Sequence, residues 1–360
     1  MLNARVLKAA SAALLVSLSL TACDPPIPPG LLALQAEIEV QCEEGEVTTA
    51  FPESMTDLAL TWSESLLVAC ENMALTNLGV DANEPDLLVS EPSLVAGRCE
   101  PFAEVPLAID AAVLVINIPD FFEIFLTAQQ IVDIFNGTIT NWSDPALAEF
   151  NGDFPLPDLP IVLPTEATAN TKAALSEWIG RLAGVPLDLS GISDSKAANE
   201  LSFASPAEEG SISIASYGAA TFAGSATVAV MVDANDPESF VRASYAELIS
   251  AATQLTSTIE GTAVKVTLDP SIEPQAEAGL DEGVEPYQAI YAIDIALCGE
   301  DTTLKRTMAR YLLRQDSQGV ILSSTLIPLP ESIRVDAISV VVVGLPTPIP
   351  PATDETGEDQ

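Results

Sequence analysis

Residues 126–178 decide the fold of this chain: they read LTAQQIVDIFNGTITNWSDPALAEFNGDFPLPDLPIVLPTEATANTKAALSEW. The pattern predicts two helices, a proline-rich linker, a short strand and a third helix. Thr127 and Gln130 have the spacing of a capping box, and Gly137 stands where the first helix should end. Asp144–Pro145 predicts the second helix start, because proline at the first helical position sacrifices no hydrogen bond.

The second half of this stretch predicts a buried strand followed by an amphipathic helix. Residues 161–163 (IVL) follow the prolines of the linker and have the composition of a short strand. Asn170 or Thr171 then caps the third helix, which ends at Gly184. Its apolar stripe consists of Ala174, Leu175, Trp178 and Leu182.

The first residues of the chain have the pattern of an export signal. Arg5 and Lys8 precede an apolar run over residues 9–20, and LTAC ends at Cys23. This predicts a lipoprotein signal peptide at residues 1–22, with Cys23 as the acylated first residue of the mature protein. The alternative is a plain signal peptide with a cysteine there by chance. Residues 23–32 are rich in proline and predict a stiff tether between the lipid anchor and the domain.

The composition excludes several classes of function. The 360 residues include 52 acidic and 13 basic side chains and no histidine, with a net charge of −39. Such a chain repels nucleic acid and anionic lipid, and it cannot use histidine as a catalytic base or a zinc ligand. No nucleophile–base pair is visible, so we expect a protein that is not an enzyme and needs no cofactor or metal. No apolar run after the signal is long enough to span a membrane.

Four cysteines remain after Cys23: Cys42, Cys70, Cys99 and Cys298. An even number in an exported chain predicts two disulfides, for which three connectivities are possible. The spacing contains no C-x-x-C pair, which argues against a metal site.

IFNGTITNWSDP at 134–145 and LPDLPI at 156–161 resemble the phosphate-binding proteins of ABC importers. Residues 105–117 also resemble the strand by which that family first crosses its hinge, and residues 210–217 resemble its G-x-I-G-Y strand and turn. The resemblance implies a two-lobe α/β periplasmic-binding-protein fold, type II-like, in which each lobe is a mixed sheet flanked by helices.

The same resemblance implies the domain boundaries. Lobe 1 is expected to be discontinuous, at 33–116 and 286–345, and lobe 2 to occupy 117–285. An acidic, disordered tail is expected at 346–360. It also implies the disulfide pairing Cys70–Cys99 and Cys42–Cys298, because both would then join parts of lobe 1.

The ligand site that the resemblance implies uses hydroxyl and amide donors at helix N-termini. The matching positions are Thr48, Thr49, Ser90, Thr165, Thr168, Asn170 and Thr171. The alternative for these hydroxyls is ordinary capping and turn chemistry. Two departures stand out. The family's R-S-D-G-S-G-T-T loop falls on PTEATANT at 164–171, where Glu166 adds a repelling charge, and Glu91 replaces the arginine that often follows the serine.

The family implies an extracytoplasmic solute-binding protein, held at the outer face of the cell membrane by its lipid anchor. Its expected partners are a small phosphate-like solute and an ABC permease, and not nucleic acid. The altered loop favours a weak phosphate site, and the alternative is a surface lipoprotein with a structural or interaction role. A basic ridge at Lys305, Arg306, Arg310 and Arg314 is either a docking face or a neutraliser of its own acidic neighbours.

Overall fold

The structure is a computed structural model that describes residues 28–38, 40–152, 155–196, 201–275 and 284–342. The expected signal peptide, Cys23 and the 346–360 tail lie outside these residues, as does the first part of the expected tether.

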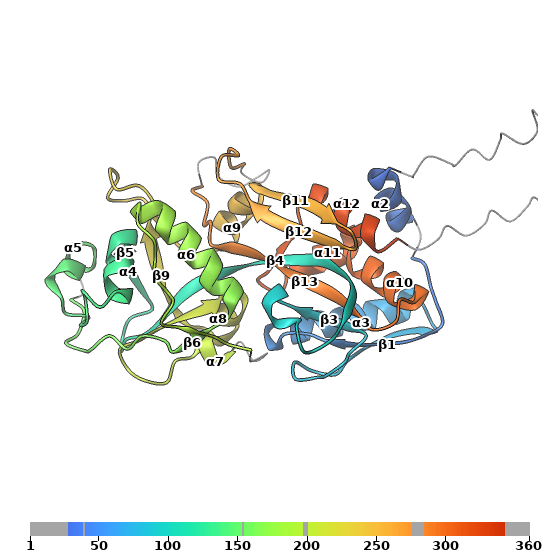
Figure 1. The fold of residues 1–360 in the computed structure, drawn as a ribbon, viewed down its shortest axis with the longest axis horizontal. Coiled ribbons are helices and arrows are strands. Elements are labelled where there is room, and N and C mark those ends of the chain that lie inside the picture. The colour runs from blue at the N-terminus through green and yellow to red at the C-terminus, as the bar shows by residue number, and fades with distance from the viewer. Residues whose placement is uncertain (1–27, 39, 153–154, 197–200, 276–283, 343–360) are drawn as a thin grey trace, which may run out of the picture.

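Two lobes share one long strand, β4 (Pro101–Asn117), which crosses between them (Figure 1). Up to Ala111 it pairs with β13 (Ile290–Cys298), and from Ala112 onward it pairs with β8 (Ser211–Ser216). Its run of valine, leucine, isoleucine and alanine is buried almost throughout, as a strand covered on both faces requires. The two-lobe α/β fold expected from the sequence is therefore confirmed.

Lobe 1 is a mixed sheet in the order β4-β13-β3-β1-β2, in which β1, β2 and β3 are parallel. The strands not yet defined are β1 (Gly45–Ala50), β2 (Met73–Asn77), β3 (Leu87–Ser90), β11 (Leu255–Glu260), β12 (Ala263–Leu268) and β14 (Ile327–Pro328). The helices are α2 (Pro29–Ile38), η1 (Glu53–Met55), α3 (Thr56–Ala69), η2 (Pro92–Leu94), α9 (Tyr245–Ala252), α10 (Thr303–Leu312), α11 (Gln315–Ile321) and α12 (Glu331–Val340).

Lobe 2 is built around the second half of β4, with β8 and β9 antiparallel to it and β5 parallel to β9. Its other strands are β5 (Glu123–Thr127), β6 (Glu166–Ala167), β7 (Ser193–Asp194), β9 (Ala226–Met231) and β10 (Phe240–Val241). Its helices are α4 (Ala128–Phe135), η3 (Pro145–Leu147), α5 (Ala148–Asn151), α6 (Ala169–Ala183), α7 (Leu201–Ala204) and α8 (Tyr217–Ala223).

Most of the local expectations for residues 126–178 are confirmed. Thr127 and Gln130 form the capping box of α4, and the Asp144 side chain caps the next helical turn. Two details differ. The cap of α6 is Thr168, whose hydroxyl accepts from the Thr171 backbone N–H, rather than Asn170 or Thr171. The strand expected at 161–163 is only an isolated bridge between Val162 and Ser211.

The two most specific sequence segments hold each other in place. The Trp142 backbone N–H donates to the Leu159 carbonyl at 2.9 Å, and its buried indole N–H donates to the Gly210 carbonyl at 2.8 Å. Gly210 has φ +82°, and a Cβ there would lie 2.4 Å from the Pro160 oxygen. The NW and PDLP segments are therefore scaffold, and their side chains stabilise lobe 2 rather than form a ligand site.

The lobe boundaries differ from those expected. The hairpin β11–β12, expected in lobe 2, packs on α12, and Ala263 pairs with Glu104 of β4, so it belongs to lobe 1. The chain returns to lobe 1 between β10, which pairs with β9, and α9, which packs on β13 and β14. The sequence did not predict this hairpin because few of its side chains are buried, so the apolar alternation of its two strands is weak.

The disulfides are Cys42–Cys70 and Cys99–Cys298, so the expected pairing is wrong. Strand register explains the outcome. Gly45 pairs with Met73, which brings Cys42 to the end of α3, and Cys298 pairs with Pro101, which brings it next to Cys99. Neither of these two strand registers could be predicted from the sequence.

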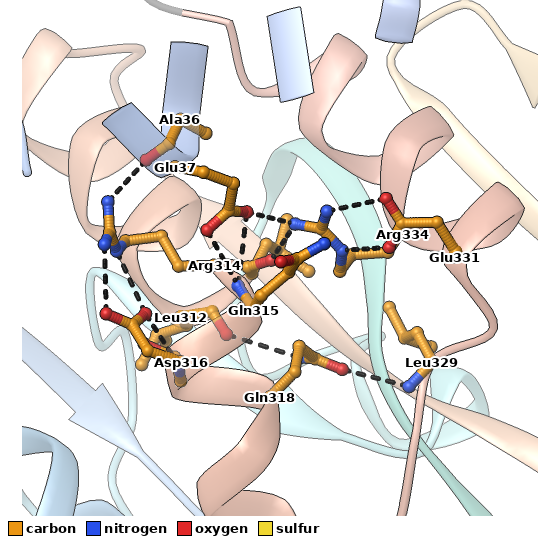
Figure 2. Close-up of polar contacts among 12 residues, drawn as sticks. Ala36, Glu37, Leu312, Arg314, Gln315, Asp316, Gln318, Leu329, Glu331 and Arg334 are labelled. Carbon is orange, nitrogen blue, oxygen red and sulfur yellow. Dashed lines mark hydrogen bonds and ion pairs between the residues drawn. The ribbon is translucent and has the colours of Figure 1, made fainter. Parts of the chain in front are cut away.

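Residues 29–32, expected in the tether, form the first turn of α2 instead. This helix is fixed to the C-terminal helices by the polar network of Figure 2. The buried Arg334 donates to Glu37 of α2 at 2.6 Å, and Arg314 donates to the Ala36 carbonyl at 2.5 Å. The N-terminal helix is therefore an integral part of lobe 1.

The basic ridge on and after α10 is engaged within the molecule. Lys305 pairs with Asp86, Arg306 with Asp301 and Arg314 with Asp316. Arg310 donates to the Gln41 side chain. These contacts support the second explanation, a ridge that neutralises its own acidic neighbours.

Candidate functional site

The lobes meet where the end of β3 faces the beginning of α6. Ser90 ends β3, and Glu91 and η2 follow it on the lobe 1 side. On the lobe 2 side, Asn170 accepts a hydrogen bond at 2.9 Å from the Ser93 backbone N–H. In a second contact, Trp178 of α6 packs against Tyr287, with ring centroids 4.3 Å apart and the ring planes tilted by 53°. The cleft is therefore closed in this structure by contacts between the lobes.

Glu91 is the central side chain of this junction, and it is only 1% exposed. The Tyr291 hydroxyl donates to its Oε1 at 3.2 Å, while the buried Oε2 has no hydrogen-bond partner in the described part of the chain. Burial raises the pKa of Glu91 to about 7. The nearby Asp110 also raises the pKa, whereas polar contacts from Thr168 and Tyr291 oppose the rise. None of these neighbours is basic.

Asp110, on the hinge strand β4, occupies the beginning of α8. Its Oδ1 accepts from the backbone N–H of Gly218 at 3.0 Å and from that of Ala111 at 2.7 Å. Burial raises the pKa of Asp110 to about 6, although these hydrogen bonds and one from Ser216 favour its charged form. Gly218 permits the approach, because a Cβ there would lie 3.2 Å from Oδ2.

Two carboxylates of the chain, those of Glu91 and Asp110, thus lie at the positively polarised N-terminal ends of α6 and α8. Glu91 lies at the start of α6, and Asp110 is bound at the start of α8. An external oxyanion would have to displace them or lie beside them in a region of low dielectric, where repulsion between like charges is strong. The arrangement favours hydrogen-bond donors and cations over anions.

The structure brings only part of the expected site together. Thr168, Thr171 and Ser90 are buried close to Glu91, and Asn170 bridges the lobes. The Thr168 and Thr171 hydroxyls are 2.8 Å apart and bonded to each other, as expected of capping chemistry. The Ser90 hydroxyl donates to the Glu91 carbonyl at 3.1 Å.

The remaining expected ligands lie elsewhere. Both the N–H and the hydroxyl of Thr48 donate to Asp86, and the Thr49 hydroxyl donates to the Thr76 carbonyl. Thr165 and Glu166 are exposed next to β7. The repelling charge in the cleft is therefore Glu91, and not Glu166.

Two functional candidates were missed from the sequence, Tyr291 and Asp294 of β13. Tyr291 holds Glu91, and Asp294 lines a cavity of about 250 Å³ between α6, the β11–β12 hairpin and β13. The signal that could have found Asp294 is an acid inside the otherwise apolar strand 290–298.

Residues 90–294 match the family model of the PBP superfamily domain. This match covers more than half of the chain, which therefore belongs to the PBP superfamily. No curated protein sequence matches the chain.

Several solved structures share this fold. A phosphate-binding protein from Stenotrophomonas maltophilia is 15% identical over 82% of this chain and 93% of its own, with a TM-score of 0.50. A high-affinity periplasmic phosphate-binding protein bound with phosphate, PfluDING, is 13% identical over the same shares, with a TM-score of 0.50. A putative phosphate ABC transporter substrate-binding protein from Clostridium perfringens is 13% identical over 79% of this chain and 100% of its own, with a TM-score of 0.46. At these identities, the likeness to the two structures with a TM-score of 0.50 shows the fold alone.

Within the described residues, no helix is long and apolar enough to cross a membrane. The same part of the chain contains no group of three or more histidine, cysteine or acidic residues arranged to hold a metal ion.

Proposed function

We propose that this chain is an extracytoplasmic solute-binding lipoprotein of an ABC importer, and that its cleft has lost tight binding of phosphate. It is a capture protein rather than an enzyme, and it works with a permease and needs no cofactor. The observation that carries the loss of phosphate binding is Glu91, which is buried between the lobes and whose Oε2 has no hydrogen-bond partner among the described residues. The phosphate-binding proteins that the sequence resembles often have an arginine at this position.

The energetics of this exchange oppose oxyanion capture. Hydrogen bonds to a charged group contribute about 1.5–3 kcal/mol each, and an arginine makes two of them to one anion. Replacing that arginine with a carboxylate removes this stabilisation and adds repulsion. The neighbours of Glu91 instead suit a solute that donates hydrogen bonds, whether neutral, zwitterionic or cationic.

Calorimetry on ligand-stripped protein tests the loss of phosphate binding. We expect a phosphate Kd weaker than about 100 µM at physiological salt, whereas an intact charge-paired site could reach below a micromolar. Glu91→Gln should tighten the Kd about tenfold or more, because it removes the buried charge. Glu166→Gln, at an exposed position, serves as the matched control and should leave the Kd unchanged. A micromolar isotherm for the wild type would show that Glu91 does not block the site.

The anchoring is proposed from LTAC at 20–23, and α2 supports it. The helix begins at Pro29, close behind Cys23, and its exposed face carries Leu31, Leu34 and Ile38. Its one charged residue, Glu37, is paired inward with Arg334. An uncharged apolar face is compatible with a position at the membrane surface, unlike most of this acidic chain.

Mass spectrometry of protein purified from membranes tests the anchor. We expect a diacylglyceryl cysteine at Cys23 as the first residue, and Cys23→Ser should release the protein from the membrane fraction. Mature protein that retains residues 1–22 would contradict the anchor without affecting the proposal for the cleft.

A second function, a surface module that captures no solute, is favoured by the contacts that close the cleft. Asn170 to Ser93 and Trp178 to Tyr287 are direct protein contacts that join the lobes. Small-angle scattering distinguishes the two functions. A capture protein should change its radius of gyration when Asn170→Ala loosens the cleft and again when solute is added, whereas a module should not respond to any solute.

A further inference from the structure

The cavity beside Asp294 is lined mainly by apolar side chains, and its charged lining residues are Asp294, Glu177 and Lys265. It measures about 250 Å³, below the 300–1,000 Å³ typical of pockets for drug-sized ligands, so it fits a small solute. Ala173 and Ala174 of α6 form one wall, and Val266, Ile290 and Ala292 of lobe 1 form the other. Because both lobes contribute, a ligand here would bridge them.

Asp294 is 4% exposed, and its buried Oδ1 has no hydrogen-bond partner within the residues that the structure describes. A register shift between Ile293 and Asp294 marks an irregularity in the pairing of β13 with β4 at this point. Such bulges re-aim side chains and are frequent beside functional sites. A buried carboxylate oxygen without a donor is unfavourable, so a partner that supplies a proton or a positive charge is needed here.

The charged groups around Asp294 do not neutralise it. Burial and the nearby Glu104 raise its pKa to about 7, and Lys265 lowers it only in part. Lys265 is half-exposed and pairs with Glu104 at 3.7 Å. At the rim of the cavity, Glu177 pairs with Arg181 at 3.6 Å. Lys265 and Arg181 are thus each paired with an acid other than Asp294. The charged side chains that line the cavity, Asp294, Glu177 and Lys265, carry a net negative charge when ionised.

The chemistry of the lining selects the class of ligand. A calcium or magnesium ion needs about six oxygen ligands, whereas the lining includes only two carboxylates, and that of Glu177 is paired with Arg181. An anion would meet the carboxylate directly. An organic ammonium satisfies both features, because its charged head pairs with Asp294 while its alkyl body covers the apolar walls.

We propose that this cavity binds a small organic cation, with a primary ammonium on Asp294 and an alkyl body between α6 and the β11–β12 hairpin. The proposal rests on the proposed function in one respect: it names the class of solute that a binding protein with an acidic cleft would capture. Binding would hold α6 of lobe 2 against β13 of lobe 1, and so stabilise the closed form.

The test is calorimetry of the mature chain with n-butylammonium at pH 8.5, using 1-butanol as the neutral isostere. We expect n-butylammonium to bind with a millimolar or lower Kd, and 1-butanol to bind at least tenfold more weakly. Asp294→Asn should weaken binding of n-butylammonium at least tenfold. Glu177→Gln, at the exposed rim, should change it less than threefold. At pH 5.5, where Asp294 is protonated, the wild type should also bind at least tenfold more weakly.

Equal binding of n-butylammonium and 1-butanol would overturn the proposal, as would an unchanged Kd in Asp294→Asn. Asp294→Leu guards against a folding defect, because an apolar side chain fits these walls and should keep or raise the melting temperature while abolishing binding. A phosphate titration of the same samples separates the two proposals. Tight phosphate binding would contradict the proposed loss of the phosphate site, whether or not the amine binds.

Discussion

At the scale of single residues, three buried acids distinguish this chain: Glu91, Asp110 and Asp294. Burial raises the pKa of each, to about 7, 6 and 7 respectively. A surface acid would remain ionised at neutral pH and would contribute only to the long-range electrostatic potential of the protein. These three take up protons near neutrality, so the junction of the lobes is sensitive to pH.

The free energy of unfolding should therefore fall as pH rises from about 5 to 8. In this window the unfolded chain has released these protons while the folded chain still holds them, so raising the pH favours unfolding. A shift of the Glu91 pKa from 4.5 to about 7 corresponds to at most about 3 kcal/mol.

Urea denaturation at pH 5, 6, 7 and 8 checks this dependence. Glu91→Gln should flatten the profile in part, because the amide does not titrate, and Glu166→Gln should leave it unchanged. A stability that rises over the same range would contradict the assignment of Glu91 as a buried acid. Partial burial would raise the pKa of Asp86, but hydrogen bonds from Thr48 and Lys305 lower it overall. Asp86 therefore titrates below pH 5 and does not contribute to the predicted dependence.

At the scale of elements, α2 is held by a buried ion network rather than by a broad apolar face. Arg334 of α12 is 2% exposed and binds Glu37, Glu331 and the Leu313 carbonyl (Figure 2). The contacts of α2 with the core come mainly from Ala33 and Ala36, which bury little surface. The attachment of this helix therefore depends on Arg334.

Arg334→Met should lower the free energy of unfolding by about 3–5 kcal/mol, because it leaves Glu37 partly buried without its cation. Arg181→Met, which breaks the exposed pair with Glu177, is the control and should cost less than about 1 kcal/mol. Equilibrium urea unfolding measures both. Equal losses for the two variants would mean that the network adds no stability.

At the scale of the whole molecule, the two disulfides differ in the length of the loop that each one closes. Cys42–Cys70 closes a loop with a sequence separation of 28, and Cys99–Cys298 one of 199 that contains all of lobe 2. Lobe 1 is discontinuous, so the second bridge fastens its two parts next to the β4–β13 pairing.

Removing the long bridge should destabilise the protein more than removing the short one. Loop entropy gives about 5 kcal/mol for Cys99–Cys298 and about 3.5 kcal/mol for Cys42–Cys70. Thermal unfolding of Cys99→Ala/Cys298→Ala and of Cys42→Ala/Cys70→Ala compares them. If the short bridge proves the more important, then the entropy of the unfolded chain does not control their contributions.

Features that depend on neighbouring residues could be predicted from the sequence. The capping box at Thr127, the stop at Gly137 and the left-handed end of α6 at Gly184 all follow from chemistry within a few residues. The NW and PDLP segments also carried enough pattern to indicate the two-lobe fold. Glu91 was visible as a departure from the expected arginine, but its burial was not.

Features that depend on strand register and on contacts between the lobes could not be predicted from the sequence. Residues far apart in sequence, such as Cys99 and Cys298 or Glu91 and Tyr291, meet because β13 lies between β3 and β4. The β11–β12 hairpin belongs to lobe 1 through another long-range pairing, that of β12 with β4. Local signals fix helices and turns, whereas the pairing of distant strands determines which of the described acids are buried, and those acids form the proposed site.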